Sequence, residues 1–219
     1  MKNKIFGVNK NVFFLGLVSF FNDFSSEMVQ SVMPVFLTVT LGTPAFFIGF
    51  IEGVADALSS VFKLISGLIS DKIHKRKKLA VTGYSISVST RFVLALASNF
   101  WQVFTLRIID RIGKGLRDSP RDALIGESAD REELGKSFNF HRMMDTMGAT
   151  LGPLCGFFIL LLIPLSLGAY DGYRILFFIA FLLGLPAIAS FIFVKETTNQ
   201  NNRQNKLSWT LFKKNKKFI

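Results

Sequence analysis

Residues 67–77 read Gly-Leu-Ile-Ser-Asp-Lys-Ile-His-Lys-Arg-Lys and separate two long apolar stretches of the chain. The glycine permits close contact between helices, the aspartate stands at the end of the first apolar stretch, and a basic run follows it. Lys and Arg in a short loop are retained on the cytoplasmic side of a membrane. This segment therefore predicts a cytoplasmic turn between two membrane helices, and the hydropathy of the flanking chain should decide the fold.

Six apolar stretches follow one another along the chain, and each has about 20 residues or more, enough to cross roughly 30 Å of hydrocarbon as a helix. They cover residues 11–36, 45–69, 79–97, 100 to about 120, 137–163 and 174–194. The fourth is the least apolar, because Arg107, Asp110, Arg111 and Lys114 interrupt it. The pattern predicts an all-α polytopic membrane protein, with a bundle of six transmembrane helices over residues 11–194.

The composition agrees with this prediction. Half of the residues are apolar, the mean hydropathy is +0.40, and 26 Lys+Arg against 15 Asp+Glu leave a net charge of +11. Basic residues beside membrane spans account for this charge, so we expect no nucleic-acid partner. One cysteine excludes a disulfide framework, and with only two histidines it excludes a Cys/His zinc site. We expect neither a metal nor a cofactor.

The Lys and Arg residues alternate between the connections. They precede the first stretch and follow the second, fourth and sixth, whereas residues 37–44, 98–99 and 164–173 contain none. This distribution predicts that both chain termini are cytoplasmic. Residues 1–10 are then a cytoplasmic segment, and residues 195–219 are a cytoplasmic polar and basic tail or the start of a central linker. The expected location is the plasma membrane, in a bacterium the inner membrane.

Several ionisable residues lie inside the predicted spans, where such residues usually face a cavity, a partner or the bundle interior. They are Asp23, Glu27, Glu52, Asp56, Arg107, Asp110 and Arg111. One interpretation is a polar cavity in which carboxylates carry protons and arginines bind substrate. The other is internal ion pairing, of Asp110 with Arg107 or Arg111 and of Asp56 with a neighbouring helix. Asp23 and Glu27 are the better candidates for proton transfer, because their own helix offers no nearby cation.

Two segments together resemble motifs of the major facilitator superfamily, a large family of secondary transporters. Residues 67–77 are similar to its loop G-x-x-x-D-[RK]-x-G-[RK]-[RK], although His74 stands where the second glycine is usual. Residues 107–124 are similar to the arginine and glycine pattern of its fourth helix. The resemblance implies half of a twelve-helix fold, built from two inverted repeats of three helices.

In that family the loop aspartate and basic residues at the end of the fourth helix form a clasp that holds the inner gate shut. Carried over to this sequence, the resemblance implies that Asp71 is the clasp carboxylate and that Arg117 or Arg121 is its partner. The loop part of the predicted gate consists of Gly67, Asp71, Lys75 and Arg76.

The fifth apolar stretch resembles the glycine-proline motif of drug:proton antiporters in the same family. The matching residues are Gly148, Gly152, Pro153 and Gly156, whereas Phe157 and Asn139 stand where the motif has glycine. The resemblance implies a fifth helix that bends and packs closely, and it slightly favours efflux over uptake.

The predicted function is that of a proton-coupled secondary transporter of a small solute. Because the resemblance covers six of the usual twelve helices, we expect an N-terminal half, or a half that pairs with a second six-helix bundle from its own copy or another chain. The alternative is a non-transporting membrane scaffold that binds a partner. An intramembrane enzyme is disfavoured, since no Ser/His or paired-His arrangement is expected to face another across the spans.

Overall fold

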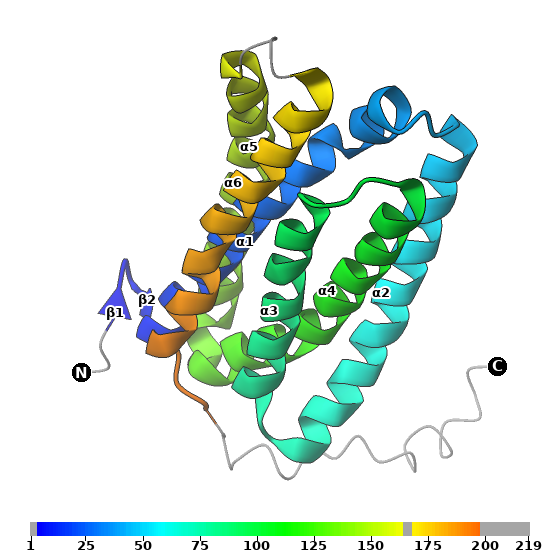
Figure 1. Cartoon of the computed structure of the whole chain (residues 1–219). Helices are drawn as coiled ribbons and strands as arrows, with labels where there is room; N and C mark the ends of the chain where they lie inside the picture. Colours follow the sequence, from blue (N-terminus) through cyan, green and yellow to red (C-terminus); the bar gives the residue numbers. More distant parts are fainter. Residues whose placement is uncertain (1–3, 164–167, 198–219) are drawn as a thin grey trace, which may run out of the picture.

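The structure is a computed structural model that describes residues 4–163 and 168–197 (Figure 1). It confirms the predicted all-α fold, with one small addition, an antiparallel pair of two-residue strands near the N-terminus. The long helices are α1 (Lys10–Val35), α2 (Ala45–Ile73), α3 (Arg76–Leu94), α4 (Phe100–Ser128), α5 (Leu134–Leu162) and α6 (Gly168–Ser190). The short elements are β1 (Lys4–Ile5), β2 (Val8–Asn9), the π-helix η1 (Phe36–Thr40) and the 3-10 helices η2 (Arg131–Glu133) and η4 (Phe191–Phe193). Most of the predicted tail, residues 198–219, lies outside the described residues.

The helices form two groups of three that lie side by side (Figure 1). Helix α1 packs against α5 and α6, α4 packs against α2 and α3, and contacts between α3 and α6 join the groups. Exchanging α1 with α4, α2 with α5 and α3 with α6 maps these five contacts onto themselves. Two three-helix repeats, α1–α3 and α4–α6, would produce this pattern.

Glycines let the helices approach closely within each group. A Cβ built on Gly148 would lie 2.5 Å from the backbone oxygen of Phe20, and one on Gly152 would collide with the backbone of Phe24. On the other side, a Cβ on Gly115 would lie 2.5 Å from the backbone oxygen of Ser59 in α2. Small residues at such contacts drive helix association in membranes, where apolar burial against lipid contributes little. Gly156 also faces α1, and Pro153 lies inside α5.

Four of the described segments are long and apolar enough to cross a membrane, judged by length and composition alone. They are Lys10–Thr40, Ala45–Ile73, Arg131–Leu162 and Tyr170–Phe193. The prediction of six spans is thus only partly supported. Helix α3 begins with three basic residues, and α4 carries charges along much of its length. The α4 arginines at positions 107, 111 and 117 are each about 4% exposed, so the composition of α4 reflects its inward face.

The fourth helix is longer than the sequence indicates. The predicted end near Pro120 is wrong, because α4 continues to Ser128 and so includes Arg121, which follows that predicted end. A proline inside a helix removes one backbone hydrogen bond. The last turns of α4 nevertheless bury Leu124 and Ile125 in an apolar cluster, and this burial favours continuation of the helix past Pro120.

The basic segments come together at one end of the bundle. The side-chain amide of Asn11 donates to the backbone oxygen of Lys195 at 2.9 Å, and the Lys77 amide donates to the Glu196 carboxylate at 3.0 Å. In the N-terminal segment, Lys4 pairs with Glu133, and the hydrogen bond between them raises the pKa of Lys4. At the opposite end, the Tyr170 hydroxyl donates to the backbone oxygen of Ala97.

Candidate functional site

A cluster of charges lies where α1, α2 and α4 meet. Arg107 on α4 donates hydrogen bonds from Nη2 to both carboxylate oxygens of Glu52 on α2, at 2.6 and 2.8 Å. One turn further along α4, Arg111 donates from Nη2 to Gln30 on α1 at 2.8 Å and lies 3.4 Å from Glu52. Arg111 Nε is also 3.6 Å from Asp56 on α2. The expected pairing of Asp56 with a neighbouring helix is confirmed.

The two sides of this cluster differ in exposure. The side chains of Arg107 and Arg111 are 5% exposed, whereas that of Glu52 is 33% exposed and that of Asp56 is 71% exposed. The carboxylates of Glu52 and Asp56 are therefore partly accessible, whereas the guanidinium groups that contact them are buried. The Nε of Arg111 remains a donor without an acceptor among the described residues. Such a site can exchange its internal partners for groups of a bound solute.

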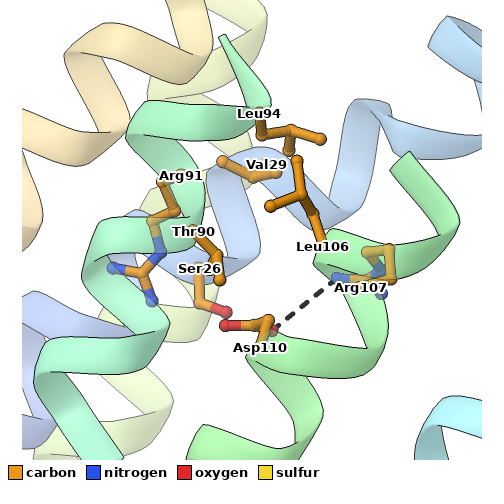
Figure 2. Close-up of a pocket in the computed structure, with 8 residues that line it drawn as sticks. All are labelled: Ser26, Val29, Thr90, Arg91, Leu94, Leu106, Arg107 and Asp110. Atoms are coloured by element: carbon orange, nitrogen blue, oxygen red, sulfur yellow. Dashed lines mark ion pairs between the residues drawn. The ribbon is translucent and has the colours of Figure 1, made fainter. Parts of the chain in front are cut away.

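Of the two possible partners of Asp110, Arg111 is not the one paired with it, because the side chains of Asp110 and Arg111 lie on different faces of α4. Arg111 faces α1 and α2, while Asp110 lies 3.9 Å from Arg107 and lines a cavity of about 20 Å³ with Arg91 and Thr90 (Figure 2). The alternative pairing of Asp110 with Arg107 is the one formed. This cavity has room for about one water molecule.

The two carboxylates proposed for proton transfer lie on α1 in different surroundings. Asp23 accepts a hydrogen bond from the Asn22 amide at 2.9 Å and lies 4.0 Å from Arg117 on α4. Its own helix offers no nearby cation, but the neighbouring helix α4 does. Within the described residues, Glu27 has no hydrogen bond or ion pair through its side chain. Glu27 is thus the less constrained of the two.

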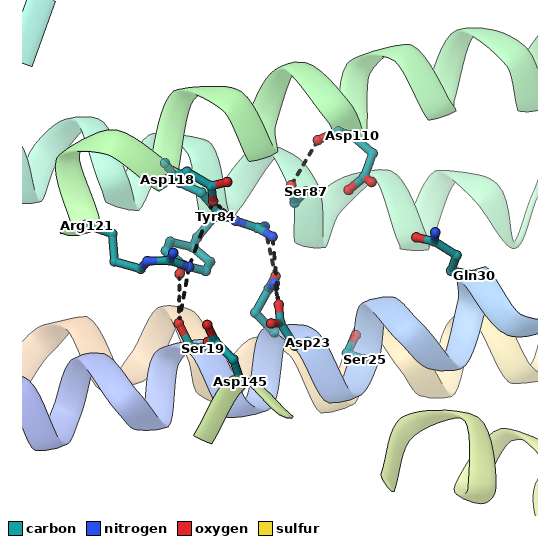
Figure 3. A network of polar contacts seen from close by, with 12 residues as sticks. Ser19, Asp23, Ser25, Gln30, Tyr84, Ser87, Asp110, Asp118, Arg121 and Asp145 are labelled. Carbon is teal, nitrogen blue, oxygen red and sulfur yellow. Dashed lines mark hydrogen bonds and ion pairs between the residues drawn. The ribbon is translucent and has the colours of Figure 1, made fainter. Parts of the chain in front are cut away.

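A buried polar network joins α1 to α3 and α4 (Figure 3). Arg91 on α3 donates to Ser25 at 2.7 Å and to Asn22 at 2.9 Å, and Arg117 donates to the same Asn22 oxygen at 3.1 Å. The Arg117 guanidinium also lies 4.6 Å from the centre of the Tyr84 ring. We did not single out the α1 partners from the sequence. Their spacing of three residues, continued by Ser19, was the available signal for a polar face on α1.

Ser19, His141 and Asp145 form a row of polar contacts between α1 and α5. Ser19 Oγ lies 2.7 Å from His141 Nε2, and His141 Nδ1 lies 3.5 Å from Asp145. The expectation that no serine faces a histidine across the spans is therefore wrong, because the close α1–α5 contact brings the two helices together. Ser19 is fully buried and also contacts the hydroxyl of Tyr84 and the guanidinium of Arg121. Its hydroxyl lacks the access that a nucleophile needs.

Replacing Ser19 with alanine should lower the stability of the bundle by about 1–2 kcal/mol, because it leaves buried partners on α3 and α5 without their shared hydroxyl. The midpoint of thermal unfolding of the purified protein in detergent measures this. Ser31→Ala is the matched control on α1, since Ser31 bonds only to the backbone of its own helix. Equal midpoints for the two variants would contradict a bridging role for Ser19.

The predicted gate residues pair differently from the expectation. Asp71 is 3.1 Å from Arg76, five residues away, and not in contact with Arg117 or Arg121. The two α4 arginines instead lie inside the bundle, within 4 Å of Asp118. In this structure Arg117 and Arg121 face inward, because α4 extends past Pro120, and the role of Asp71 in a clasp stays a prediction.

The end of α4 contacts the start of α3 through Glu127, a residue that we did not single out from the sequence. Arg76 forms a close ion pair with Glu127, in the last turn of α4, and both side chains are largely buried. Burial raises the pKa of Glu127, and Arg76 opposes this shift. Gly67 lies against Ser119 of α4, and Lys75 is the residue before α3.

Within the described residues, no group of three or more His, Cys, Asp or Glu side chains is arranged to hold a metal ion. The charges that converge in the bundle are instead arginines and carboxylates from different helices.

Comparisons with known proteins agree on one family. Residues 15–219 match the family model described as Major Facilitator Superfamily. An uncharacterized MFS-type transporter of Methanocaldococcus jannaschii is 34% identical over 208 residues, 95% of this chain and 50% of that protein. Multidrug resistance protein MdtH of Photorhabdus laumondii is 30% identical over 120 residues, 55% of this chain and 30% of that protein. The chain thus spans half or less of the length of these relatives.

Solved structures show the same fold. A tetrameric structure of PepTSo2 has a TM-score of 0.78 and 19% identity, and the match covers 94% of this chain and 46% of that one. A POT family transporter in complex with 5-aminolevulinic acid has a TM-score of 0.76 and 14% identity, with 97% and 46% covered. At this level of identity the likeness concerns the fold alone.

Proposed function

Since the chain belongs to the Major Facilitator Superfamily and is a multi-pass membrane protein, we propose that it is a proton-coupled secondary transporter of a small solute. The observation that carries this proposal is the cluster around Arg107 and Arg111. A bundle that needed only stability would fill this place with apolar or small residues, because charged groups inside a membrane are costly. Here arginines are buried beside carboxylates that remain partly open.

The assignment of roles follows from the contacts. Arg107 and Arg111 hold Glu52 and Asp56, and a solute would enter by replacing one of these contacts. Glu27 carries the coupling proton, because its carboxyl group has no partner among the described residues and so can change its charge without breaking an ion pair. We assign the role of a second proton carrier to Asp23, which lies 4.0 Å from Arg117.

The direction of transport that we propose is export. The relative named a multidrug resistance protein supports it, as do the close α1–α5 contacts made by Gly148 and Gly152. We place both chain termini in the cytoplasm. The support is that the segments at residues 4–9, 74–75, 129–133 and 194–197 lie at one end of the bundle and contain all the Lys and Arg residues that the described part of the chain has outside its long helices, namely Lys4, Lys75, Arg131 and Lys195. All six long helices would then cross the membrane.

A second six-helix bundle, from the same polypeptide or from another chain, is part of the proposal. Helices α2 and α5 expose many large apolar side chains, more than a monomer in water would tolerate. On α2 they include Phe46, Phe50, Leu64 and Leu68, and on α5 Leu154, Phe157, Leu161 and Leu162. We propose that part of these apolar faces contacts lipid and that the rest packs against the second bundle.

Neutralising the proton carriers should remove coupling to the pH gradient. In liposomes that contain the purified protein, the flux of ethidium, a cationic dye, or of fluorescein, an anionic one, should depend on an imposed pH gradient. In the Glu27→Gln and Asp23→Asn variants that dependence should fall by about tenfold or more, the change that about 1.4 kcal/mol produces.

Asp171→Asn is the control, since Asp171 is exposed at the start of α6. Gradient-driven flux that is unchanged in both Glu27→Gln and Asp23→Asn would overturn the assignment of the carriers. If neither dye moves with the gradient in the unmodified protein, the non-transporting scaffold is favoured, and size determination in detergent would show whether the protein self-associates.

A further inference from the structure

A pocket of about 310 Å³ opens at the basic end of the bundle, between the end of α2 and the start of α3. It lies outside the cluster of arginines and carboxylates described above. Its walls are of three kinds, namely lysine side chains, hydroxyl groups and aliphatic side chains. They are provided by Lys75 and Lys78, by Ser70 and Thr82, and by Ile69, Ile73 and Leu79.

The pocket contains a buried polar atom without a partner. Ser70 is 2% exposed and lines the pocket, and its Oγ has no hydrogen bond to any described residue. A buried hydroxyl left unpaired is unfavourable, so the position calls for a group with which it can form a hydrogen bond. The other hydroxyl in the wall differs, because Thr82 already donates to the backbone oxygen of Lys78.

The residues that the structure describes do not neutralise the positive charge of the lysines at the pocket. Arg76 is held by Asp71 and Glu127, but neither Lys75 nor Lys78 lies within 4 Å of a carboxylate in the described residues. Both lysines are exposed. The pocket therefore offers two free ammonium groups beside a free hydroxyl, which is suited to a phosphate group.

An apolar path leads away from this polar mouth along α3. The pocket shares Thr82 with a second cavity of about 520 Å³ between α3 and α4. Its wall is mainly aliphatic, with hydroxyl groups between the aliphatic side chains; besides Thr82 it is lined by Val81, Ile86, Val93, Leu106 and Ile109 and by Ser85, Ser89 and Thr90. This path exists because α4 packs against both α2 and α3, whereas those two helices contact each other little. A free phosphate ion would leave this path empty, whereas the acyl chain of a lipid could pack along it.

We propose that this pocket binds one anionic phospholipid, with its phosphate between Lys75 and Lys78, an ester or phosphate oxygen accepting from Ser70 Oγ, and an acyl chain along α3. The charge of the mouth favours an anionic headgroup over a zwitterionic one. The apolar path favours a lipid over an inorganic anion. The proposal requires only that the chain lies in a membrane, and it is independent of transport.

Titration of the full chain in detergent with dioleoylphosphatidylglycerol, followed by native mass spectrometry, tests this site. We expect one lipid to bind before all others, about tenfold or more tightly than dioleoylphosphatidylcholine. The double variant Lys75→Gln/Lys78→Gln should lose this preference, and Ser70→Ala should weaken it. The matched control Lys72→Gln/Lys77→Gln removes the same charge from the same turn without touching the pocket, and it should keep the preference.

Three outcomes would overturn the proposal. An equal loss in both double variants would mean that the lipid responds to the general charge of this end of the bundle. Competition by millimolar inorganic phosphate that abolishes lipid binding would mean that the pocket is an anion site and not a lipid site. Retention of the first lipid in Lys75→Gln/Lys78→Gln would also exclude it.

Discussion

The variant Arg107→Gln should insert and fold but lose transport, with a flux reduced by about tenfold or more. Arg107 is the most completely paired side chain of the charged cluster, because it holds both oxygens of Glu52. Removing it leaves Glu52 with the weaker contact from Arg111 at 3.4 Å. The cost in stability should be about 1–3 kcal/mol. It is below the 3–5 kcal/mol typical of a fully buried pair, because a third of the Glu52 side chain is exposed.

The double variant Arg107→Gln/Glu52→Gln separates a structural arginine from a functional one. Removing both charges of a pair can be nearly neutral, so the stability should return part of the way toward that of the unmodified protein. It should stay short of it, because Asp110 also loses its contact with Arg107. If Arg107 serves the solute, transport should remain lost. Flux in liposomes and the midpoint of thermal unfolding are measured on the same preparations, with Arg174→Gln, on α6 and outside the charged cluster, as the control. Recovery of transport in the double variant would show that the pair is structural.

Gly115→Val should have the largest effect on folding. A Cβ at this position would lie 2.5 Å from the backbone oxygen of Ser59, 2.7 Å from Phe62 Cβ and 3.0 Å from the backbone nitrogen of Lys63. Two of these atoms belong to the backbone of α2 and cannot rotate away. Helix α2 must then shift from α4, and we expect a loss of about 1–3 kcal/mol or more. Because Glu52 and Asp56 are on α2, the same shift would pull both carboxylates away from the α4 arginines.

Gly126→Val is the control for this prediction, because it makes the same change in the same helix where nothing lies within 4 Å. The thermal midpoint and the yield of monodisperse protein in detergent should fall for Gly115→Val and stay nearly unchanged for Gly126→Val. Equal behaviour of the two variants would mean that the α2–α4 contact is not limiting for the fold.

The residues that were predicted best from the sequence are those whose position depends on one helix alone. The six long helices, their order and the short basic turn at residues 74–75 follow from hydropathy, which is a local property. The same holds for the clustering of Asp23 with Glu27 and of Glu52 with Asp56, since side chains four residues apart share a helix face. The end of the fourth helix was misjudged, because burial of Leu124 and Ile125 extends α4 and that burial depends on other helices.

Partners were decided only by the tertiary structure. Two carboxylates, Asp110 beside Arg111 and Asp56 on another helix, were both possible partners of that arginine, and only the packing of α2 against α4 selects Asp56. The same is true of the Ser19–His141 contact, which joins residues 122 positions apart through the glycine-lined approach of α5 to α1. Hydropathy and helical period determine which segments become helices and on which face of its helix a side chain lies. The rotation and spacing of one helix against the next, set by glycines and buried side chains, fix what it meets.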